Sequence, residues 1–71
     1  MRYFVRVIAR GEHVPKEHVV RRGPPSEALD RACAFLAHDP ADIWIEDEHG
    51  NRIAEKLRII EHCRQRGLLP R

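Results

Sequence analysis

The sequence predicts an α+β fold: a single small domain with the element order β-β-α-β-α, in which a three-stranded mixed sheet of order 2-1-3 packs against helices. Three observations predict this class. Short segments alternate apolar and polar residues as half-buried strands do, two longer segments repeat apolar residues at helical spacing, and glycines and prolines separate the segments. The 71 residues suffice for one compact domain, residues 1–71, and are too few for a second.

The first two strands are expected at residues 3–10 and 17–22. Residues 3–10 read YFVRVIAR, which places Tyr3, Val5 and Val7 on one side of an extended chain and two arginines on the other. Residues 17–22 read EHVVRR and are β-branched at their centre. A glycine and a proline stand between the two segments, so we expect a hairpin.

The first helix is expected at residues 27–38. Its apolar residues fall on one helical arc: Ala28, Leu29, Ala32, Cys33, Phe35 and Leu36. Ser26 follows two prolines and is expected to cap the helix, because its hydroxyl can accept a bond from a free backbone N–H. The helix is expected to end before Asp39, since Pro40 disfavours helical angles in the residue ahead of it.

The third strand is expected at residues 42–47, which read DIWIED and place Ile43 and Ile45 opposite Trp44. The first strand is the longest and most apolar, so we expect it at the centre of the sheet. A right-handed crossover then makes the third strand parallel to the second and antiparallel to the first. Two helices on one face leave the other face open, unless the last helix covers it.

The second helix is expected at residues 52–66. Ile53, Leu57 and Ile60 cluster on one arc of it, whereas Ile59 lies nearer to cationic side chains. The apolar arc is wide enough for two neighbours within the fold, or for one neighbour and one partner. An alternative makes the segment EDEHGNRI a hairpin, with residues 52–54 as a short fourth strand.

The charges are unevenly distributed along the chain. Thirteen basic and eleven acidic residues give a net charge of +2, too small to indicate a nucleic-acid partner by itself. The net charge is +4 in residues 1–25, −6 in residues 26–51 and +4 in residues 52–71. Eleven of the cations are arginines, which is typical of a GC-rich bacterial or phage genome and also suits planar recognition of carboxylate or phosphate. No apolar run approaches the roughly 18 residues of a membrane span, so we expect a soluble, cytoplasmic protein.

The sequence predicts no enzyme, metal or cofactor site and no small-molecule substrate. The only serine stands where a helix begins, and Cys33 and Cys63 lie on apolar arcs, so we interpret both cysteines as free, buried thiols. The five histidines show none of the spacings of zinc motifs. The acidic residues 46–48 point to alternate sides of a strand, which does not suit a divalent cation.

The candidate binding residues lie on the second face of the sheet and on the last helix. Exposed aromatic and arginine side chains are typical of binding hot spots. The candidates are Phe4, Arg6, Ile8, Arg10, Trp44, Arg52, Lys56 and Ile59. We expect Trp44 to be partly exposed. If it is buried instead, the binding surface is expected at Arg52, Lys56 and Ile59.

These observations predict a small non-enzymatic protein-interaction module, of the accessory or inhibitor type, that acts through a surface bearing arginine and tryptophan. The expected partner is another protein or a second copy of the chain, paired through the open sheet face or an edge strand; no membrane partner is expected. The alternative is a nucleic-acid-binding protein that stacks bases on Phe4 and Trp44 and binds phosphates with Arg6 and Arg10.

Overall fold

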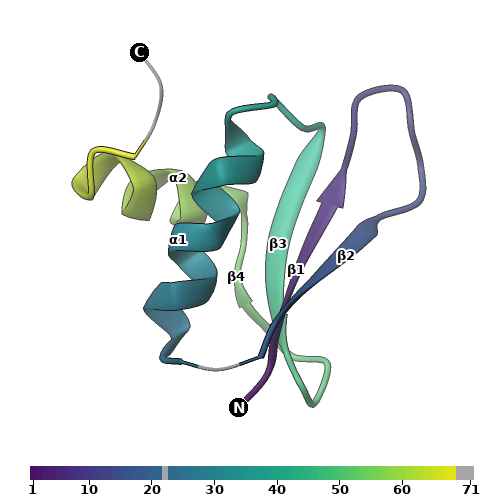
Figure 1. The fold of residues 1–71 in the computed structure, drawn as a ribbon. Helices are drawn as coiled ribbons and strands as arrows, with labels where there is room; N and C mark the ends of the chain where they lie inside the picture. Colours follow the sequence, from purple (N-terminus) through teal and green to yellow (C-terminus); the bar gives the residue numbers. More distant parts are fainter. Residues whose placement is uncertain (22, 69–71) are drawn as a thin grey trace.

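The computed structural model describes residues 1–21 and 23–68, which form four strands and two helices. The elements are β1 (Tyr3–Ile8), β2 (Lys16–Val20), α1 (Pro25–Leu36), β3 (Asp42–Asp47), β4 (Arg52–Ala54) and α2 (Lys56–Gln65). The strands form one sheet in the order β2-β1-β3-β4, and every neighbouring pair is antiparallel. Both helices pack on the same face of the sheet, so the fold has two layers (Figure 1).

The predicted α+β class is confirmed, with β1 between β2 and β3 as expected. Within the described residues the sheet has four strands rather than three, and it is antiparallel throughout rather than mixed. The N-cap of α1 is Pro24 rather than Ser26, because the fixed φ of Pro25 suits the first helical position and the helix therefore starts before Ser26. The predicted end of the second strand, residue 22, lies outside the described residues.

The fourth strand is the alternative interpretation of residues 52–54, and a tight turn explains it. Gly50 has a φ of +83°, which glycine adopts without steric cost. The Gly50 N–H donates to the Asp47 carbonyl at 3.1 Å, and the Asp47 N–H donates to the Asn51 carbonyl at 2.9 Å. These bonds close a hairpin between β3 and β4, so α2 begins only at Lys56 instead of residue 52.

The Asp47 carboxylate stabilises this turn. Its Oδ1 accepts hydrogen bonds from the backbone N–H groups of His49 at 2.8 Å and Asn51 at 2.9 Å. These bonds favour the ionised form, and the bond from Asn51 contributes most. They therefore hold the pKa of Asp47 below its ordinary value.

We expect the β3–β4 turn to weaken in acid. Because the pKa of Asp47 is lowered in the folded state, its ionised carboxylate stabilises the fold. This stabilisation is complete above the unfolded-state pKa of about 3.9 and is lost as the pH falls through the folded-state pKa. A carboxyl-carbon NMR titration should show Asp47 titrating below about pH 3.9. Acid should speed the hydrogen exchange of the Asn51 amide, because protonation weakens its bond to Asp47, and Asp47→Asn should remove this effect. An Asp47 that titrates at its ordinary pKa would contradict the prediction.

The core lies between the sheet and the helices. Its largest fully buried side chains are Ile43, Ile45, Ile59, Val5 and Cys63. In α2 the buried side is formed by Ile59 and Cys63, whereas Leu57 is 82% exposed and Ile53 of β4 is 40% exposed. The predicted arc of the last helix is therefore wrong. Ile53 belongs to a strand, and two residues four positions apart, Ile59 and Cys63, determine which side of α2 faces the sheet.

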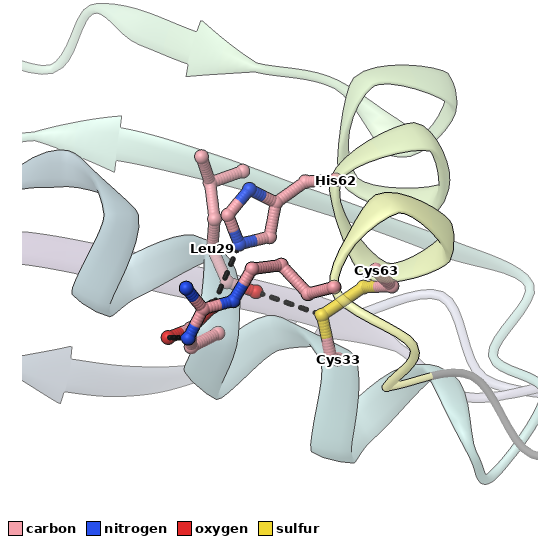
Figure 2. Close-up of polar contacts among 6 residues, drawn as sticks. Leu29, Cys33, His62 and Cys63 are labelled. Carbon is pink, nitrogen blue, oxygen red and sulfur yellow. Dashed lines mark hydrogen bonds and ion pairs between the residues drawn. A yellow bond between two sulfur atoms is a disulfide. The ribbon is translucent and has the colours of Figure 1, made fainter.

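Cys33 and Cys63 form a disulfide that joins α1 to α2, with the sulfur atoms 2.01 Å apart and the Cα atoms 5.7 Å apart (Figure 2). The prediction of two free thiols is wrong. Each cysteine lies on a buried arc as expected, but their pairing results from the packing of the two helices. The Cys33 sulfur is also 3.2 Å from the Leu29 carbonyl oxygen, a close contact in which the disulfide sulfur has no hydrogen to donate.

Candidate functional site

The sheet face opposite the helices carries a network of ion pairs. Arg6 of β1 lies across from Glu17 of β2 and from Trp44 of β3. Its guanidinium pairs with Glu17 at 3.0 Å, and its Nε contacts the carboxylate of Glu46. All three charged side chains are partly exposed, so each pair contributes at most about 1 kcal/mol. The network nevertheless neutralises Arg6 and links three neighbouring strands.

Trp44 lies within this network and is buried, with 8% of its surface exposed. Its Nε1–H donates to Glu46 Oε2 at 2.9 Å. The guanidinium of Arg52 lies over the indole ring, 4.3 Å from the ring centroid. The expectation of partial exposure is therefore wrong. The side chain that covers Trp44 is Arg52 of the edge strand β4. The last helix does not pack on this face of the sheet.

This arrangement affects both predicted functions of the face. Arg6 is engaged by two carboxylates and Trp44 lies under Arg52, so neither is presented as base stacking or phosphate binding requires. Binding of nucleic acid stays an untested prediction, and no observation in the structure favours it. Arg52 packs on the Trp44 ring, and this contact stabilises the sheet between β4 and β3.

Of the other candidates in or near β1, Phe4 and Ile8 lie on the same face as Arg6, whereas Arg10 lies apart from them. Phe4 and Ile8 are half-buried, and the Phe4 ring centroid is 6.0 Å from the Arg6 guanidinium. Arg10 lies beyond the end of β1 and pairs with Asp39 at 3.0 Å in the loop between α1 and β3. The hydrogen bond from Arg10, followed by its charge, lowers the pKa of Asp39. Arg10 therefore connects two loops and lies apart from Trp44.

A second surface lies where β4 meets the first turns of α2. We define the β4–α2 surface as Arg52, Ile53, Lys56, Leu57 and Arg58. Ile53 and Leu57 are its exposed apolar residues, and the other three are cations. Ile59, which we expected beside Arg52 and Lys56, is 0% exposed and belongs to the core. The sequence spacing of Ile53 and Leu57 predicts the buried side of a helix, whereas both residues are exposed.

An apolar depression of about 300 Å³ adjoins the β4–α2 surface. Its lining residues are Met1, Tyr3, Pro25, Leu29, Asp47, Ile53, Ala54 and Arg58. Ile53 and Arg58 belong to both the depression and the β4–α2 surface. A volume at the lower limit of ligand-sized cavities suits one or two apolar side chains of a partner.

The polar contacts beside the disulfide are structural. His62 Nε2 lies 2.7 Å from Asp30 Oδ1, and Arg66 contacts the other oxygen of Asp30 at 3.3 Å. Figure 2 shows His62 and Cys63 on the same helix, α2, and the sulfur–sulfur bond that joins Cys63 to Cys33 of α1. These contacts bind α2 to α1, and Cys63 is held in the disulfide instead of being available as a nucleophile.

The structure also bears on metal binding and on membrane insertion. In residues 1–21 and 23–68 no group of three His, Cys, Asp or Glu side chains could hold a metal ion. Neither of the helices in these ranges is long and apolar enough to cross a membrane.

Comparison with protein-family models, with curated proteins and with solved structures finds no match to this chain.

Proposed function

We propose that this protein is a non-enzymatic interaction module that binds a partner protein through the β4–α2 surface. The observation that carries the proposal is the 82% exposure of Leu57, beside the exposed Ile53 of an edge strand. Adjacent exposed apolar residues rimmed by charged ones are typical of protein-binding sites. Arginine, which stands at two positions of this surface, is enriched in binding hot spots.

The disulfide bears on where this interaction takes place. Disulfides persist in oxidising compartments and are rare in the reducing cytosol. Cys33 and Cys63 are paired and buried, so the fold as described contains the oxidised pair. We therefore propose an oxidising compartment in place of the cytoplasmic location expected from the sequence.

The variant Leu57→Glu is expected to lose partner binding while it keeps the fold, because the new charge replaces an apolar side chain that is outside the core. Wild-type and variant chains are immobilised, and proteins captured from an extract of the source organism are identified by mass spectrometry. A captured protein is then purified and titrated by calorimetry. We expect at least about a tenfold loss of affinity, or ~1.4 kcal/mol, on substitution of Leu57.

The matched control is Val14→Glu, which introduces the same charge at a residue that is 74% exposed in the loop between β1 and β2. This control should capture the same proteins as the wild type. Circular dichroism should show the same secondary structure for all three chains. Equal capture by the wild type and by Leu57→Glu would refute the proposed function.

A further inference from the structure

Strand β4 forms one edge of the sheet and is paired only with β3 in the described part of the chain (Figure 1). The free side of an edge strand presents backbone N–H and C=O groups that can pair with another extended chain. β4 reads RIA and has no Pro or Lys to block this edge, although it is only three residues long, begins with the charged Arg52 and shows a register shift in its pairing with β3. The free side of β4 therefore offers pairing groups for a short extended segment only.

The side chains beside this edge determine which strand would fit. Ile53 lies on β4 and also lines the apolar depression, together with Tyr3 and Leu29 of the helix-covered side of the fold. In a bound strand, alternate side chains point to opposite sides. One apolar side chain of the partner can therefore enter the depression while its backbone pairs with β4.

The β4–α2 surface carries three cations and adjoins one exposed acid, Glu55, so its net positive charge favours an acidic partner. Arg52 pairs with Glu55 at 3.6 Å, and Lys56 donates to the Pro40 carbonyl at 3.2 Å. Arg58 has no ion pair among the residues that the structure describes. The nearby Asp47 is already bound within its turn. A second copy placed on this surface by a two-fold axis would bring like cations together, which is unfavourable.

We propose that β4 and the first turns of α2 bind an extended acidic segment of a partner protein by strand addition. An apolar side chain of the segment occupies the depression, and a flanking carboxylate pairs with Arg58. This inference rests on the proposed function and names the chemistry of the partner. Strand addition supplies affinity through the backbone, whereas the depression and the cations supply specificity.

The test uses three fluorescein-labelled synthetic peptides of eight residues and the oxidised full chain. In the first peptide Ile and Glu alternate, in the second Ile and Lys alternate, and the third is the Ile–Glu peptide with alternate backbone nitrogens methylated. Fluorescence anisotropy at low salt should show the Ile–Glu peptide binding at least about tenfold more tightly than the Ile–Lys peptide. Methylation should weaken binding by about fivefold or more, because it removes the N–H donors.

Two variants of α2 with the same charge change separate a local contact from an effect of net charge. Arg58→Glu should weaken binding of the Ile–Glu peptide by about fivefold or more, and Arg64→Glu, in the last turn of the helix, by less than about twofold. Amide chemical shifts of the labelled protein should change at residues 52–58. Equal binding of the Ile–Glu and Ile–Lys peptides, equal effects of the two variants, or no binding would overturn the inference.

The two proposals fail in distinguishable ways. If no peptide binds while a captured protein still discriminates the wild type from Leu57→Glu, the acidic-strand inference is wrong and the interaction surface stands. If capture is insensitive to Leu57→Glu, the proposed function itself is wrong. Concentration-dependent sedimentation of the chain alone, abolished by Leu57→Glu, would identify a second copy as the occupant and would also overturn the acidic-strand inference.

Discussion

Replacement of both Cys33 and Cys63 by alanine is expected to lower the free energy of unfolding by about 3–4 kcal/mol. The disulfide closes a loop over a sequence separation of 30 residues, which restricts the unfolded chain. The effect is large for a domain of this size, whose total stability is of the order of 5 kcal/mol. The loss of stability should affect α2 first, because Ile59 and Cys63 are the fully buried apolar residues that pack this helix on the sheet.

Urea unfolding followed by circular dichroism measures this difference. The oxidised wild type is compared with the double alanine variant, and each is measured with and without a dithiol reductant. The reductant should lower the unfolding midpoint of the wild type and leave that of the double variant unchanged. The same midpoint for oxidised wild type and double variant would show that the disulfide does not stabilise the fold.

Trp44→Ala is expected to lower the free energy of unfolding by about 3 kcal/mol, at the lower end of the range for large aromatic residues. The substitution removes the ring beneath Arg52 and the hydrogen-bond donor to Glu46. It also leaves the ion pair of Arg6 and Glu46 more exposed to solvent. Trp44→Phe keeps most of the apolar volume and loses the Nε1–H donor. It should therefore cost less, about 1–2 kcal/mol.

Fluorescence tests the burial of Trp44 directly, because it is the only tryptophan of the chain. The wild-type emission should be blue-shifted and protected from iodide. Arg52→Ala should shift the emission to the red and increase quenching, since the guanidinium is the group that lies over the ring. A matched change on the same face of the sheet but at its opposite edge, Val19→Ala of β2, should leave the emission unchanged. A red-shifted wild-type emission would contradict the burial.

The elements with their own periodicity were predictable from the sequence. In β3, Ile43 and Ile45 lie on the side opposite Trp44, and α1 carries a continuous apolar arc, so local chemistry favours each element before any packing occurs. Strand β4 has three residues, too few for a period to be distinguished from helical spacing. It forms because the Gly50 turn directs the chain back along β3, and pairing with that strand overrides the helical pattern.

The candidate surface was only partly predictable for the same reason. Arg52 and Lys56 were expected beside an apolar residue, and the structure supplies Leu57 and Ile53 in that role instead of Ile59. The wheel of a helix starting at residue 52 places Ile53 with Leu57, but the true helix starts at Lys56 and is positioned by Ile59. Because Ile53 belongs to β4, Leu57 has no apolar neighbour one turn before it in the helix, and the side formed by Ile59 and Cys63 packs on the sheet instead.

The sequence by itself determined the α+β class, the central position of β1, and the sides of β1, β3 and α1 that face the core. Only the tertiary structure decided the pairing of Cys33 with Cys63 and the cover of Trp44 by Arg52. Periodicity indicates which side of an element is apolar, because it depends on residues a few positions apart. What packs against that side depends on distances between elements that are remote in the chain, and these distances exist only once the sheet and the helices have assembled.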